Sequence, residues 1–130
     1  SLYFAKPSKQ LVALCPQADL DMANSRSTIE RCYADLQAQH EALWRAALAG
    51  VRSRRGAHAE ALELAEAAVE IRRAGQSPMD LADALERLGE VRARAGRREP
   101  AARAYREALR LATAKGDRVS AARIRSALPG

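Results

Sequence analysis

The feature that most constrains this chain is an internal repeat with an offset of 40 residues. When residues 61–88 are laid over residues 101–128, small residues fall on small residues and leucine falls on leucine: Ala61 on Ala101, Ala68 on Ala108, Ala74 on Ala114, Ala82 on Ala122 and Leu88 on Leu128. The match continues upstream, where Gly56 falls on Gly96, Leu48 on Leu88 and Val51 on Val91. A fixed period of this kind is typical of stacked supersecondary units, so we expect an array of similar units.

The composition indicates that these units are helical. Hydrophobic residues make up 48% of the chain but aromatic residues only 4%, so a core must be built from alanine, leucine, valine and isoleucine. Alanine is the strongest helix former, and leucine, arginine and glutamate follow closely. We therefore predict an all-α fold, with close helix contacts wherever alanines face each other.

Cap signals divide the repeat into helices. Ser77 is suited to an N-cap, Pro78 to the first helical position and Asp80 to the positively polarised first turn. Forty residues later, Gly116 provides a helix stop and Asp117 the next N-cap.

Within each unit a glycine separates two helices. Gly56 and Gly96 are expected to end first helices, and Pro100 fits the first turn of the helix that follows Gly96. The sequence thus predicts antiparallel helix hairpins near 37–75 and 78–115, followed by a capping helix near 118–128.

Apolar residues at helical spacing predict the buried faces. The first helices carry two matching stripes, which are Leu81, Leu85, Leu88 and Val91 in the later unit and Trp44, Leu48 and Val51 in the earlier one. The second helices carry Leu62, Ala65 and Val69, and then Ala101, Tyr105, Ala108 and Leu111. One hairpin cannot bury both faces alone, but a stacked neighbour can.

Residues 1–36 are predicted to form an N-terminal arm and a degenerate helical repeat. Pro16 interrupts any early helix, and the segment Ser27–Glu30 fits a capping box. One apolar face is expected at Leu20, Ile29, Tyr33 and Leu36, and the segment 2–4 is expected to act as an arm that covers the first face.

The formal net charge of +6 is concentrated near the C-terminus. Residues 92–130 hold eleven lysines and arginines against three acids, a balance of +8. Such a region can attract nucleic acid, an anionic membrane or an acidic protein. Arginine supplies 19 of the 22 basic residues, so the alternative is that arginine is simply the surface cation of a GC-rich genome.

Sets of reactive or ligating residues were not found in the sequence. Cys15 and Cys32 form no CxxC pair, and His40 and His58 are far apart in sequence, so we expect two reduced cysteines, no metal and no cofactor. No phosphate loop or GxSxG turn occurs, and the triplet that begins at His58 lacks the PCxxC segment of zinc deaminases. No apolar run is long enough to cross a membrane. We therefore expect a cytoplasmic protein that is not an enzyme.

The later unit resembles the tetratricopeptide repeat (TPR) family. That family's pattern has a large apolar residue, a Leu-Gly pair, a small residue opening the second helix, an aromatic residue and another small residue. The chain fills these slots with Leu85, Leu88, Gly89, Gly96, Ala101, Tyr105 and Ala108. The earlier unit matches more loosely, since Ala65 stands in the aromatic slot and Trp44 lies one place early. The resemblance covers about residues 42–128.

The long repeat is also similar to the TPR arrays at the C-terminal end of large actinobacterial signalling regulators. In those proteins the array follows a nucleotide-cyclase or transcription-factor module and a P-loop ATPase module. The resemblance implies that this chain is a regulatory region of such a protein, and its start at Ser1 without methionine is expected of a fragment or a processed product.

The resemblance further implies a binding groove lined by the first helices, which takes a peptide. Carried over by position, the residues facing it are Arg54, Asp83, Glu86, Glu90, Arg94 and Arg123. This groove is expected to be acidic in the middle and basic at its rims. The other interpretation of these charges is that they are the solvated face of a helix.

Three kinds of partner are compatible with the sequence. The first is a protein or peptide in the groove. The second is nucleic acid, held by the basic region Arg92–Arg125, although Tyr105 is the only aromatic residue among those arginines and single-strand binders interleave cations with aromatics. The third is a second copy of the chain, associated through the apolar end faces of the array.

Overall fold

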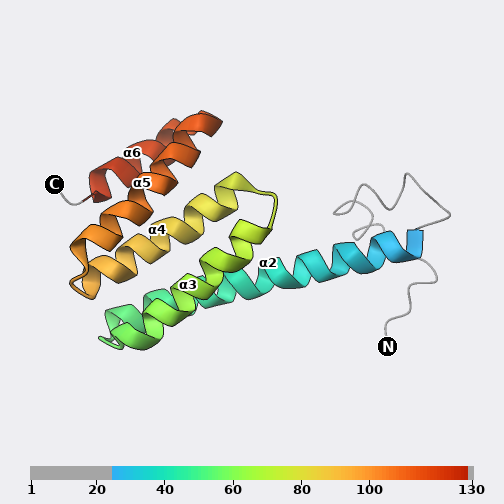
Figure 1. The fold of residues 1–130 in the computed structure, drawn as a ribbon, viewed down its shortest axis with the longest axis horizontal. Coiled ribbons are helices and arrows are strands. Elements are labelled where there is room, and N and C mark those ends of the chain that lie inside the picture. Colours follow the sequence, from blue (N-terminus) through green and yellow to red (C-terminus); the bar gives the residue numbers. More distant parts are fainter. Residues whose placement is uncertain (1–24, 129–130) are drawn as a thin grey trace. The chain divides into compact units, whose positions relative to one another are not determined.

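The computed structural model describes residues 25–128, and that range contains helices and no strand (Figure 1). The helices are α2 (Ser25–Arg54), α3 (His58–Ala74), α4 (Pro78–Arg94), α5 (Arg98–Lys115) and α6 (Arg118–Ala127). The predicted all-α class, with helix hairpins and a final short helix, is confirmed. None of the helices in this range is long and apolar enough to cross a membrane.

The chain divides into two compact units, Ser1–Ala38 and Gln39–Gly130. Of the first unit the structure describes residues 25–38, the start of α2. The predicted arm at residues 2–4, together with Pro16 and Leu20, lies outside the described residues, and the division at residue 36 stays a prediction.

Two expectations for the start of α2 are wrong. Ser27 is not the N-cap of a capping box, because the helix begins at Ser25 and the Ser27 hydroxyl accepts a 3.4 Å hydrogen bond from the Arg31 guanidinium. Cys32 is disulfide-bonded, not reduced. The chain has one other cysteine, Cys15, which lies outside the described residues. Ile29 is buried as predicted, and Tyr33 and Leu36 are half-buried.

The ends of α2, α4 and α5 share one backbone geometry, whereas α3 ends at Gly75 in an extended conformation. Gly56, Gly96 and Gly116 all have φ near +80°, the left-handed conformation that glycine adopts without strain. After each of them, the next N–H bonds to a carbonyl five residues earlier, as Arg97 does to Arg92 at 2.9 Å and Asp117 to Ala112 at 3.0 Å. These are Schellman motifs, which satisfy carbonyls that have no partner within the helix.

The predicted N-caps are confirmed. The Ser77 hydroxyl accepts a hydrogen bond from the backbone N–H of Asp80 at 3.2 Å, with Pro78 at the start of α4. The Asp117 carboxylate accepts one from the N–H of Ser120 at 3.0 Å. Each bond satisfies one of the N–H groups that the first turn of a helix leaves unpaired.

The core of the second unit lies between consecutive helices. Helix α4 contacts both α3 and α5, and α5 contacts α6, so these helices stack in chain order (Figure 1). Leu85, Leu88 and Val91 of α4 are buried, as predicted from their spacing. Tyr105 of α5 is buried against Gly89, because a Cβ at that glycine would lie only 2.9 Å from the tyrosine ring. The aromatic residue of the repeat therefore packs on the glycine of the Leu-Gly pair.

The stripe predicted for the earlier unit is wrong. Trp44 is 42% exposed, with the Arg45 guanidinium 4.6 Å from its ring centroid, and Leu48 and Val51 are only half-buried. The buried positions of this stretch of α2 are instead the small residues Ala42, Ala49 and Ser53. Small side chains let a neighbouring backbone approach closely, so this stretch of α2 is buried at its small residues, and its larger apolar side chains are only partly covered.

An ion pair joins α3 to α5, the two second helices. The Arg73 guanidinium donates two hydrogen bonds to the Glu107 carboxylate, at 2.7 and 3.1 Å. These bonds lower the pKa of Glu107 below its ordinary value of 4.5 and raise that of Arg73. The pair is partly exposed, so solvent screening limits its contribution to stability.

We expect both a smaller side chain and a larger one in the core to be destabilising. Leu88→Ala removes a buried side chain and should lower the free energy of unfolding by roughly 2–5 kcal/mol. Ala108→Leu adds bulk at a fully buried alanine and should cost about 1–3 kcal/mol. Urea unfolding followed by circular dichroism measures both, with Val119→Ala, at a position 76% exposed, as the control. Wild-type midpoints for both core variants would contradict this packing.

We expect Glu107→Gln to be destabilising in a pH-dependent way. Because folding lowers the pKa of Glu107, its contribution is fully present above the unfolded pKa and is lost as pH falls through the folded pKa. The variant should lose up to about 1 kcal/mol near neutral pH and converge on the wild type in acid. Unfolding midpoints at neutral and acidic pH measure this. Glu63→Gln, at an exposed position without an ion pair among the described residues, should show neither effect.

Candidate functional site

A row of charged side chains runs along α4 on the side away from its buried leucines. We call it the charged row and define it as Asp83, Glu86, Arg87, Glu90 and Arg94. Steps of three and four residues keep these side chains on one face of a 3.6-residue helix. Because Leu85, Leu88 and Val91 hold the opposite side of α4 in the core, this row lies outside the core, with Asp83 and Arg94 exposed and the other three residues half-buried.

Helix α6 adds a cation to the row. The Arg123 guanidinium donates two hydrogen bonds to Glu86, at 2.8 and 2.9 Å, and a weaker one to the Ser120 hydroxyl at 3.4 Å. The bidentate geometry fixes both side chains more firmly than a single contact does. The pKa of Arg123 is raised by this hydrogen-bonded carboxylate. Glu86 and Arg123 are 37 residues apart, so only the stacking of α6 beside α4 brings them together.

In the next turn of α4, Glu90 lies between two arginines. Arg87 donates to Glu90 at 3.0 Å, and the Arg94 guanidinium is 3.8 Å from the other carboxylate oxygen. Both arginines are on the same helix, at positions three residues before and four residues after Glu90, which is the spacing at which helical side chains meet. The charge of Glu90 is thus balanced within α4.

Helix α2 reaches the row at a glycine. A Cβ at Gly50 would lie 2.8 Å from the Arg87 guanidinium and 3.3 Å from that of Arg54. The two guanidinium groups therefore converge over Gly50, and the missing side chain makes room for them. This brings Arg54, at the end of α2, beside the basic part of the row.

Asp83 differs from the other acids of the row. It makes no ion pair among the described residues, and its pKa is raised above the ordinary 3.8 by partial burial and by the nearby Glu86 charge. Arg123 and Arg72 act in the opposite direction but do not cancel these effects. Asp83 is exposed, and within the described residues it is the acid of the row that no arginine contacts.

The six residues expected to face a groove are thus linked through neighbouring contacts. Asp83, Glu86, Glu90 and Arg94 share one face of α4, Arg123 pairs with Glu86, and Arg54 meets Arg87 over Gly50. Sequence reasoning missed Arg87 and Gly50. Arg87 lies four residues after Asp83 and three before Glu90, so its position could have been found from the same helical spacing.

The chemistry of this surface is that of charged hydrogen-bond donors and acceptors. Carboxylates accept from basic side chains or backbone N–H groups, and guanidinium groups donate to carboxylates or carbonyls. Within residues 25–128, no group of three or more histidine, cysteine, aspartate or glutamate side chains is arranged to hold a metal ion. The arrangement is suited to binding a polar segment of complementary charge.

Comparison with known proteins agrees with this architecture. A family model described as "Tetratricopeptide repeat" matches residues 39–114, more than half of the chain. It covers the end of α2, all of α3 and α4, and nearly all of α5. No curated protein and no solved structure matches the chain significantly. The stacked hairpins, the close Gly89–Tyr105 contact and this match together show that the chain belongs to the tetratricopeptide repeat family.

Proposed function

We propose that this chain is a protein-interaction module that binds a peptide segment of a partner across the charged row. Tetratricopeptide repeats generally mediate protein–protein interaction, which supports the class of function. The observation that carries the proposal is Asp83, an exposed acid on the charged row that makes no ion pair in the described part of the chain. Charges that a fold leaves unfavourable are characteristic of functional surfaces, where stability is given up for binding.

The distribution of charge favours a peptide with a basic residue at one end and acidic groups further along. Among the described residues no arginine contacts the Asp83 carboxylate, which lies at the N-terminal end of the row next to Glu86, whereas Arg87 and Arg94, with Arg54 beside Arg87, lie further along. A partner lysine or arginine near Asp83 would balance its charge. Acidic groups of the peptide further along would meet the arginines, which gives the bound peptide a direction and a register.

The larger context is part of the same proposal. We infer that the chain is a regulatory region of a larger bacterial signalling or transcriptional regulator. The supporting feature is the repeat offset of 40 residues, longer than the 34 of the basic family unit and similar to the extended repeats of such regulators. In this role the bound partner would change the activity of modules elsewhere in that protein.

Nucleic-acid binding is the second candidate function. Several arginines on α5, α6 and the turn before α5 make no ion pair among the described residues, namely Arg97, Arg98, Arg103, Arg110, Arg118 and Arg125. Such cations bind phosphates without regard to sequence. The aromatic residue among them, Tyr105, is buried against Gly89 and is not available to stack on a base. The burial of Tyr105 therefore favours a protein partner over nucleic acid.

Asp83→Asn should raise the stability of the folded chain near neutral pH. Because the pKa of Asp83 is raised in the folded chain, its ionised form costs stability above the folded pKa, and that cost disappears below the unfolded pKa. The variant should melt at a slightly higher temperature than the wild type near neutral pH and at the same temperature in acid. Calorimetric melts at the two pH values, with the exposed Asp35→Asn as control, measure this. A lower melting temperature at neutral pH would show that Asp83 is a structural group.

Reversing the acidic centre of the row should abolish peptide binding. The probe is a peptide selected from a random displayed library on the wild-type protein. Its affinity should fall strongly in Glu86→Lys/Glu90→Lys and change little in Arg97→Ala/Arg98→Ala, whose arginines lie at the N-terminal end of α5. Two changes are combined because a single exposed charge contributes only about 0–1 kcal/mol. Melting curves of both variants control for folding.

The same pair of variants separates the two candidate functions. Duplex and single-stranded DNA should bind weakly at physiological ionic strength, because each phosphate contact adds about 0.9 to the log–log salt slope on duplex DNA. Tight DNA binding at that ionic strength, lost in Arg97→Ala/Arg98→Ala and kept in the glutamate variant, would replace the peptide proposal by nucleic-acid binding.

A further inference from the structure

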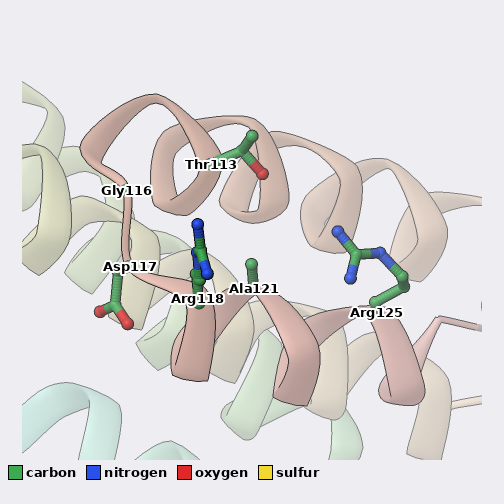
Figure 2. A pocket seen from close by; sticks show the side chains of 6 residues that line it. All are labelled: Thr113, Gly116, Asp117, Arg118, Ala121 and Arg125. Carbon is green, nitrogen blue, oxygen red and sulfur yellow. The ribbon is translucent and has the colours of Figure 1, made fainter.

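A hollow of about 380 Å³ lies between the end of α5 and the first turns of α6. Figure 2 shows the side chains that line it, which are Thr113, Gly116, Asp117, Arg118, Ala121 and Arg125. Helix α6 presents different residues to its other neighbour, since Arg123 pairs with Glu86 of α4. The hollow and the charged row are therefore separate features of the structure.

Comparison with the preceding repeat explains why a hollow exists here. With the offset of 40 residues, Ala121 corresponds to Leu81 and Arg125 to Leu85. Leu85 is buried in the core shared by α3, α4 and α5, and Leu81 packs against that core. On α6 a small residue and a cation stand at these positions. At these two positions α6 therefore has less apolar side-chain volume and more positive charge than α4 has.

The cations of the hollow are available to a ligand. Arg118 and Arg125 are seven residues apart, two turns along one face of α6, and both are exposed. In the described part of the chain neither makes an ion pair. Figure 2 shows both guanidinium groups directed toward α5, on the side where Thr113 lies. Two guanidinium groups and a hydroxyl can together donate several hydrogen bonds to one or two carboxylates.

The one acid at the hollow does not neutralise these arginines. The Asp117 carboxylate accepts from the Ser120 N–H at 3.0 Å and from the Ser120 hydroxyl at 2.7 Å. These bonds lower its pKa and keep it ionised as the N-cap of α6. In Figure 2 its side chain points away from the two guanidinium groups. Asp117 is therefore a structural acid, and the positive charge of the hollow lacks a partner in the described residues.

We propose that this hollow binds the side-chain carboxylates of an acidic peptide segment from a partner protein. The volume lies at the lower end of the range for ligand pockets, which suits one or two acidic side chains and not a whole folded surface. The donors match carboxylate geometry because each arginine can engage both oxygens of one group. This site goes beyond the peptide-binding function proposed for the charged row, uses none of its residues and selects the opposite ligand charge.

The test uses a blocked, fluorescently labelled peptide with four consecutive glutamates, and a glutamine peptide of the same length. The wild type should bind the glutamate peptide at physiological ionic strength and not the glutamine peptide. Arg118→Gln/Arg125→Gln should weaken binding about tenfold, since both charge-assisted contacts are lost. The matched control Arg103→Gln/Arg110→Gln removes the same charge from exposed, unpaired arginines of α5 and should leave the affinity nearly unchanged.

Three results would overturn the proposal. Equal loss in both arginine pairs would mean general attraction to a basic surface, and no binding of the glutamate peptide would mean no carboxylate site. If inorganic phosphate shifts the side-chain NMR signals of Arg118 and Arg125 and the peptide does not, the hollow is a site for a free anion.

A further variant separates this site from the charged row. Glu86→Lys/Glu90→Lys should bind the acidic peptide at least as tightly as the wild type does. Melting temperatures confirm that each variant is folded.

Discussion

Close approach of helices at alanine and glycine is the constraint on which the rest of this structure depends. Alanines that are completely buried occur in α2, α3 and α5, and Gly89 lies against the ring of Tyr105 with no room for a Cβ. With so few aromatic residues, the core gains its density from short distances between backbones instead of large side chains. Because no free space remains at these contacts, an added side chain must displace a neighbouring backbone or force a strained rotamer, so a core of this kind tolerates added bulk poorly.

Close packing also determines which charges meet. Helices two places apart in the array are near enough for long side chains to bridge them, and each of the two bidentate pairs makes such a connection. Arg73 and Glu107 join α3 to α5, while Glu86 and Arg123 join α4 to α6. Second helices are thus linked to second helices and first helices to first helices. These partly exposed pairs add little free energy each, but they fix the register of side chains on both sides of the stack.

The charged side chains that these ion pairs leave without a partner in the described part of the chain are informative. Within residues 25–128, Glu86 and Glu90 of the charged row are each matched by an arginine, whereas Asp83 is not, and Arg118 and Arg125 make no ion pair at the hollow beside α5. A basic residue of a peptide suits the first position, and an acidic segment suits the second. If both sites are used, one partner could contact the array through segments of opposite charge, and this would increase selectivity because a partner with either segment alone would bind less tightly.

The sequence by itself determined the helical class, the repeat and the helix ends of the second unit, because caps and Schellman turns depend on residues only a few positions apart, as at Ser77 and Gly96. It also placed Leu88 and Ala108 in the core.

The sequence was misleading about the buried face of α2, which it placed at Trp44, because hydrophobicity alone does not show that small residues lie at the contact. It predicted a capping box at Ser27, which the structure places inside α2, because a serine among other polar residues matches the cap pattern without being a cap. Only the tertiary structure decided that Glu86 is paired, that Asp83 is not, and that Arg87 lies over Gly50. These depend on distances between helices that are far apart in the chain, and no local pattern specifies them.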